Sequence, residues 1–300
     1  MRVETRRGTP AEVRAALFFL APGLFVIVVF FFLPIAASFL LSATDFDLYA
    51  LADPSNARVT GISNYRALVF DPVFLTALKN TLVFVLLGSP LTVLVALSAA
   101  LLVNARLARA KGFFRTTFFA PVVTTLVAVA VVFRYVYHPR FGLLNRGLTL
   151  IGLPAVDWLG DPRFALVAIV ILAIWKNFGF STILFVAGLQ GIPESLYEAA
   201  RLDGAGHWQQ FRRITLPLLA PTMLLVGLTR TIDYFQLFAE PYVMTSGGPL
   251  NSTLTMSLLM YKEGFRFWNM GRGAAIAFVL FGVILVATLI QFRLQKGGET

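Results

Sequence analysis

The sequence predicts an all-α membrane protein, a polytopic bundle of six transmembrane helices. Of the 300 residues, 58% are hydrophobic and only 13% are charged, whereas soluble domains carry about 25% charged residues. The apolar residues form six long stretches, and about 20 such residues in a helix cross the hydrocarbon core of a bilayer. The net charge of +10 is typical of basic residues that flank membrane spans. This composition excludes a disordered chain and argues against a nucleic-acid-binding protein.

The first three predicted spans are separated by segments that favour turns or carry charge. Span 15–41 is longer than the apolar core of a cleaved signal peptide, so we expect it to remain in the protein. Span 75–103 follows the segment Asp45–Pro72, which is rich in Asp, Gly and Pro. Span 113–137 overlaps the end of a short basic loop, Asn104–Arg115. Prolines occur in all three spans, which a bundle tolerates because neighbouring helices satisfy the freed carbonyl groups.

The last three predicted spans are 164–187, 216–239 and 274–292. The fourth and the fifth contain charged residues, whereas the sixth is apolar and ends just before a basic residue. The segments that precede the fourth and the sixth are rich in Gly, Pro, Asn and aromatic residues, as expected of loops at a membrane surface. The predicted organisation is a tail 1–14, a transmembrane domain 15–292 and a tail 293–300.

Basic residues are unevenly distributed over the segments between the spans. They are about twice as dense in the two tails and in the loops Asn104–Arg115 and 188–215 as in the other segments. Positively charged residues gather on the cytoplasmic side of membrane proteins. We therefore expect both termini to be cytoplasmic.

The predicted cytoplasmic loop 188–215 carries the signals of two short helices. Pro193 suits the first position of a helix, and the acidic residues that follow it suit the positive N-terminal end. Gly204 can adopt the left-handed conformation that ends a helix. A second short helix is expected from His207 to about Ile214, before Pro217 opens the next span. On these signals alone, the loop either binds a partner or packs on its own bundle.

The same loop contains a motif. Glu198-Ala199-Ala200, three further residues, Gly204, nine further residues and Ile214-x-Leu216-Pro217 resemble the EAA loop of ABC-importer permeases, and those of the carbohydrate-uptake class in particular. The external segment Tyr242–Phe265, with T-x-G-G-P at Thr245–Pro249, and the KNTL stretch at Lys79–Leu82 are also similar to sugar permeases of the maltose and glycerol-phosphate types. The resemblance implies coupling to an ATPase through Glu198, Ala199, Ala200, Arg201, Asp203 and Gly204.

The resemblance further implies a type I ABC importer permease bundle in the inner membrane of a prokaryote. The expected partners are a second homologous permease, two copies of a cytoplasmic ABC ATPase, an extracytoplasmic sugar-binding protein and membrane lipid, without nucleic acid. The chain has no G-x-x-x-x-G-K-[ST] motif, so ATP and Mg²⁺ are expected on the ATPase. We expect no catalytic residue, no metal site and no cofactor in this chain, which is predicted to be a transport subunit and not an enzyme.

Charged and polar residues inside the fourth and fifth spans have two interpretations, because charge within a membrane is costly and usually faces a partner or a wet cavity. Arg230, Asp233 and Tyr234 are spaced i, i+3, i+4 and share one helix face. In one interpretation Arg230 and Asp233 neutralise each other, while Lys176 packs against a neighbouring subunit. In the other, these residues line a substrate cavity. The resemblance favours a substrate path formed by Asn177, Phe180, Arg230, Asp233, Tyr234 and Leu237.

Three functions follow from these features. The first is half of a translocation path for a sugar or oligosaccharide, operated by alternating access. The second is the same machinery for glycerol phosphate or another anionic solute, because Arg230 could bind an anion as well as hold Asp233. The third is a self-contained secondary carrier or channel, which would need no ATPase.

Overall fold

The chain folds into helices joined by short connections, as the composition predicts. The computed structural model describes residues 10–104 and 111–296, and within these ranges it contains one isolated β-bridge, between Thr44 and Val59, and no named strand. The predicted tails 1–14 and 293–300 and the basic loop Asn104–Arg115 lie partly outside the described residues. The described part of the tail 1–14 is already helical, because the first helix begins at Pro10.

Five helices of the described ranges are long and apolar enough to cross a membrane. They overlap the first, second, fourth, fifth and sixth predicted spans, each of which therefore contains a helix of spanning length in the structure. The first consists of α1 (Pro10–Ile27), a π-helical turn (Val28–Phe32) and α2 (Leu33–Ser42). The others are α5 (Pro72–Asn104), α9 (Pro162–Gln190), the continuous helix His207–Phe235 and α15 (Met270–Lys296).

The third predicted span, 113–137, is not a single helix. It is divided into α6 (Lys111–Val123) and α7 (Leu126–Val136), whose axes meet at 107°. The break follows Pro121 and falls in a run of β-branched residues, which are poor helix formers. Hydropathy alone predicts one span here because both halves are apolar.

The fifth span differs from its prediction at both ends. It begins with α11 (His207–Gln210) and a π-helical turn (Phe211–Thr215) that run without interruption into α12 (Leu216–Phe235). It ends at Phe235 instead of residue 239, because Pro241 lacks the N–H that would bond the Leu237 carbonyl in a continuous helix. The Thr255 hydroxyl donates to that carbonyl instead, at 2.8 Å.

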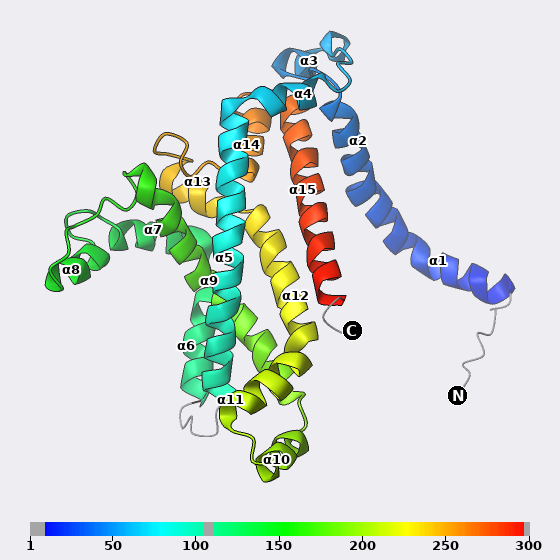
Figure 1. Cartoon of the computed structure of the whole chain (residues 1–300). Coiled ribbons are helices and arrows are strands. Elements are labelled where there is room, and N and C mark those ends of the chain that lie inside the picture. Colours follow the sequence, from blue (N-terminus) through cyan, green and yellow to red (C-terminus); the bar gives the residue numbers. More distant parts are fainter. Residues whose placement is uncertain (1–9, 105–110, 297–300) are drawn as a thin grey trace.

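The bundle is organised around α5, which packs against α9 along much of its length and against α12 on another side. The packing includes fully buried Phe84 of α5 and Phe185 of α9. The first helix behaves differently, since α2 packs on α15 whereas α1 points away from the bundle (Figure 1). The most apolar stretch of Arg14–Ser42 has no buried residue within the chain.

Short helices close the two ends of the bundle. At one end lie α3 (Leu48–Ala52) and α4 (Ser63–Phe70), and at the opposite end lies α10 (Glu194–Leu202) (Figure 1). Between the spans lie α8 (Leu143–Leu150), α13 (Ala239–Thr245), α14 (Met256–Tyr261) and a π-helical turn, Lys262–Arg266.

The KNTL stretch of α5 contacts the segment that follows T-x-G-G-P and leads into α14. The Asn80 side-chain amide donates to the carbonyls of Asn251 and Leu254, at 2.8 and 3.0 Å. The Thr81 hydroxyl accepts from the Met256 N–H at 2.9 Å. One turn of α5 therefore holds the second half of the connection between α13 and α14, together with the start of α14.

Candidate functional site

A small polar cavity lies where α12 ends and α13 begins, beside α9 and the start of α7. Its volume is about 270 Å³. Four of the six residues predicted for a substrate path line it, whereas Phe180 and Arg230 are not among its lining residues. The lining residues are Leu126, Asn177, Asp233, Tyr234, Gln236, Leu237, Phe238, Ala239 and Glu240.

Arg230 is buried and its charge is matched within the molecule. Its guanidinium lies 2.8 Å from the Asp233 carboxylate and donates to the Asn177 side-chain oxygen at 3.2 Å. It also lies over the Phe180 ring, 5.8 Å from the ring centroid, which is within the range of a cation–π contact. Only 8% of the Arg230 side chain is exposed, against 54% of the Asp233 side chain. The buried Arg230 guanidinium therefore holds the residues that line the cavity, and the Asp233 carboxylate is the member of the pair that is accessible from the cavity.

Asn177 and Tyr234 are held by the bundle as well as facing the cavity. The Asn177 amide donates to the Ala173 carbonyl at 2.9 Å, in addition to accepting from Arg230. The Tyr234 hydroxyl shares a hydrogen bond of 2.6 Å with Thr92 of α5. Its ring packs over Gly88, where a Cβ would lie 2.7 Å from the ring. Tyr234 thus joins α12 to α5, and Arg230, on the same helix face, joins α12 to α9.

The remaining two residues predicted for the substrate path are Phe180 and Leu237. Phe180 is 43% exposed on α9, so one face of its ring is open in the isolated chain. Leu237 is buried and follows the end of α12, because that helix stops at Phe235. Leu237 therefore reaches the cavity from the connection to α13 and not from a helix face.

Glu240 lines the cavity but was not among the residues predicted for the path. It lies in the first turn of α13 and is only 5% exposed. Burial raises the pKa of its carboxyl to about 7, an effect that the nearby Lys176 ammonium opposes. The sequence signal was a lone acidic residue in an otherwise uncharged stretch, just beyond the predicted end of the fifth span.

Lys176, which one interpretation of the sequence placed against a neighbouring subunit, has hydrogen-bond partners within its own chain. Its ammonium donates to the carbonyls of Pro121 and Thr124, the latter at 2.6 Å, and to that of Val122 at 3.3 Å. These carbonyls lie at the end of α6, where no further helical turn supplies N–H groups to donate to them. Lys176 therefore caps the break between α6 and α7. Its neighbour in sequence, Asn177, lines the cavity.

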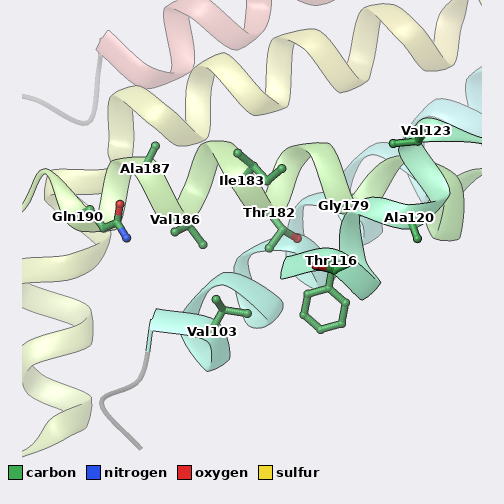
Figure 2. Close-up of a pocket in the computed structure, with 11 residues that line it drawn as sticks. Val103, Thr116, Ala120, Val123, Gly179, Thr182, Ile183, Val186, Ala187 and Gln190 are labelled. Carbon is green, nitrogen blue, oxygen red and sulfur yellow. The ribbon is translucent and has the colours of Figure 1, made fainter. Parts of the chain in front are cut away.

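A second cavity, of about 540 Å³, is lined mainly by residues of α6 and of the second half of α9 (Figure 2). Gly179 lets α6 and α9 approach closely beside it, since a Cβ there would lie 1.9 Å from the Phe118 carbonyl oxygen. The Thr182 hydroxyl already donates to the Phe178 carbonyl at 2.8 Å. Most of the other lining residues are apolar, so this cavity offers few hydrogen-bonding groups to a polar solute.

The predicted loop 188–215 forms the helix–turn–helix that its sequence indicates. Helix α10 ends in a Schellman motif, in which Ala205 N–H donates to the Ala200 carbonyl and Gly204 N–H donates to the Arg201 carbonyl. Gly204 has φ +78°, as predicted. A hydrogen bond of 2.9 Å between Tyr197 and Thr215 ties α10 to the base of α12.

The outer surface of this loop is exposed and partly apolar. Leu202 is 89% exposed and Trp208 is 70% exposed. Arg201 and Glu194 form a loose exposed pair, at 4.0 Å, which contributes little stability. Of the six residues predicted for ATPase coupling, Ala200 is half-buried and the others are exposed: Glu198, Ala199, Arg201, Asp203 and Gly204.

Comparison with known proteins identifies the kind of chain that this is. The family model described as "Binding-protein-dependent transport system inner membrane component" matches residues 7–297. The lactose transport system permease protein LacF of Rhizobium radiobacter is 37% identical over 279 residues, which are 91% of each chain. The sulfoquinovosyl glycerol transport system permease protein SmoG of Agrobacterium fabrum is 33% identical over 281 residues, covering 94% of this chain and 90% of SmoG.

The same fold occurs in a solved structure. A chain of a bacterial ABC transporter involved in the import of the acidic polysaccharide alginate superposes with a TM-score of 0.77, over 95% of this chain and 96% of that one. The sequence identity is 24%, so this likeness concerns the fold. It confirms the predicted fold class, an ABC importer permease bundle.

Proposed function

Because the chain belongs to the family of binding-protein-dependent transport system inner membrane components, we propose that it forms half of a path by which an ATP-driven importer moves a neutral sugar or oligosaccharide. The chain is a multi-pass membrane transport subunit and not an enzyme. A second, homologous permease supplies the other half of the path. An extracytoplasmic binding protein delivers the sugar, and the path opens alternately to the two sides.

The observation that carries the choice of a neutral sugar is the pairing of Arg230 with Asp233. A free buried arginine would favour an anion, and LacF and SmoG carry names that point to one neutral and one sulfonated solute. Here the guanidinium is bound to a carboxylate, an amide and a ring face. Its positive charge is therefore neutralised by Asp233 and is not available to bind an anionic solute. Glycerol phosphate or another anion is thus the weaker alternative.

The coupling to ATP is proposed to pass through α10 and the turn that follows it. This helix carries an exposed Leu202 on a loop tied to α12 through Tyr197. A cleft on the ATPase would cover the leucine and transmit its closure along α12 toward the cavity. ATP and Mg²⁺ would be bound on the ATPase alone. A self-contained carrier or channel would have no use for such a surface.

The proposed orientation places α10 and both termini on the cytoplasmic side. Basic residues then flank the cytoplasmic ends of the spans, and α3, α4 and the connection between α13 and α14 face the binding protein. The exposed apolar side chains of Arg14–Ser42 would be covered by lipid and by the second permease.

The ATPase association is tested by co-purification of the ATPase with tagged variants of the chain. Leu202→Glu places a charge on the proposed docking surface and should abolish co-purification. Leu250→Glu is the matched control, because Leu250 is also 89% exposed but lies on the connection between α13 and α14. An ATPase that stays bound to Leu202→Glu as firmly as to Leu250→Glu would refute docking through α10.

A further inference from the structure

Glu240 is a buried acidic residue to which the substrate path predicted above assigns no role. Glu240 is 5% exposed, and it lines the 270 Å³ cavity together with Asp233 and Asn177. No other described residue forms a hydrogen bond or an ion pair with its carboxylate in the structure. A buried carboxylate without a partner is costly, so its position on a cavity wall indicates a ligand that supplies hydrogen-bond donors.

The cations near Glu240 are engaged elsewhere. Lys176, on α9, donates to three carbonyls at the end of α6. Arg230, on α12, is bound to Asp233. The other elements that meet at the cavity present neutral groups, namely Leu126 of α7 and the tyrosine and amides of the wall. An occupant of the cavity therefore meets the carboxylates of Asp233 and Glu240 directly, whereas neither Lys176 nor Arg230 is among the lining residues.

This arrangement selects both for hydroxyl groups and against negative charge. An ionised carboxylate only accepts hydrogen bonds, and a sugar hydroxyl is a donor that fits it. Such charge-assisted bonds are about twice as strong as neutral ones. A uronate, sulfonate or phosphate placed in the same cavity would instead bring its anionic oxygens against these carboxylates, with no cationic donor among the lining residues.

We propose that Glu240 is a specificity-determining residue of this permease, which accepts hydrogen bonds from the hydroxyls of a neutral saccharide and, with Asp233, excludes anionic saccharides. The inference rests on the proposed function. It adds to that function a residue through which the permease itself would discriminate between neutral and anionic solutes, independently of the binding protein.

The test is saturation-transfer NMR on the purified importer without its binding protein, so that the binding protein's own selectivity is absent. The neutral probes are lactose, maltose and trehalose, and the anionic probe is digalacturonate. Wild type should bind at least one neutral disaccharide and show little binding of digalacturonate. Glu240→Gln should weaken neutral binding by about 10-fold or more, the range of one bond to a charged group, and should narrow the preference over digalacturonate.

Two further variants keep the result interpretable. Glu240→Asp retains the charge but shortens the side chain, so it should weaken neutral binding and still exclude digalacturonate. Asp53→Asn removes an exposed carboxylate outside the cavity. It should change neither the affinity for the neutral disaccharides nor the exclusion of digalacturonate. Equal melting temperatures and ATPase content would show that each variant is folded and assembled.

Two results would overturn the inference. One is unchanged affinities and preference in Glu240→Gln. The other is a wild type that binds digalacturonate better than every neutral probe. Both leave ATP-driven import by this chain intact, whereas failure of the proposed function itself would appear separately, as an importer to which no ATPase binds.

Discussion

Gly204 offers a sharp test of the loop that is proposed to meet the ATPase. Its φ of +78° lies in the left-handed region, where a residue with a Cβ costs about 1–2 kcal/mol more than glycine. Nothing lies within 4 Å of a Cβ built at this position, so the isolated chain has room for a larger side chain. The penalty for Gly204→Ala is therefore one of backbone conformation and not of space.

That penalty has a measurable size. A cost of about 1–2 kcal/mol changes the ratio of native to altered loop by about 5- to 30-fold. We expect Gly204→Ala to reduce both ATPase co-purification and sugar uptake by up to this factor. Gly204→Asn should be milder although its side chain is larger, because asparagine tolerates the left-handed region better than alanine does. Gly206→Ala is the matched control, since Gly206 has equal space but a φ of −71°, and it should be close to wild type.

The order of the variants decides the reasoning. If Gly204→Asn impairs ATPase binding more than Gly204→Ala does, the glycine is needed for clearance against the ATPase and not for its conformation. If Gly206→Ala is as harmful as Gly204→Ala, the loop requires small residues in general. Either result would refute the argument from φ.

Three further predictions concern the rest of the bundle. Asn80→Ala leaves two carbonyls without their donor, at a cost of about 1–3 kcal/mol each where they stay dry, so thermal melting should fall and protease should cut the connection between α13 and α14 sooner. Lys176→Met should loosen the break between α6 and α7, seen as a changed spin-label distance across it, and Lys176→Arg should restore that distance. Since the pKa of Glu240 is raised to about 7 by burial, its charge forms as pH rises through 7, and discrimination against digalacturonate should grow from pH 6 to pH 8.

Some of the site could be predicted from sequence because the relevant contacts are local. Arg230 and Asp233 are three residues apart on one helix, so their pairing follows from helix geometry. Gly204 follows an acidic, amphipathic helix, and its left-handed conformation follows from the usual way in which helices end.

Other features depend on contacts that join distant parts of the chain. The break after α6 is capped by Lys176, more than fifty residues later, and the end of α12 is satisfied by Thr255. Hydropathy reports only how apolar a segment is, so it cannot show where a helix stops inside the bundle. Glu240 was missed because the predicted span ended one residue before it. The sequence therefore placed Glu240 in an external segment and not among the residues that line the cavity.

The most direct test of the account is sugar uptake by proteoliposomes that contain the chain, its ATPase and the second permease. We predict accumulation of a neutral saccharide only when ATP is present on the ATPase side and the binding protein on the other, with digalacturonate excluded. Uptake driven by an ion gradient without ATP, or uptake of the anionic probe in preference to every neutral one, would contradict it.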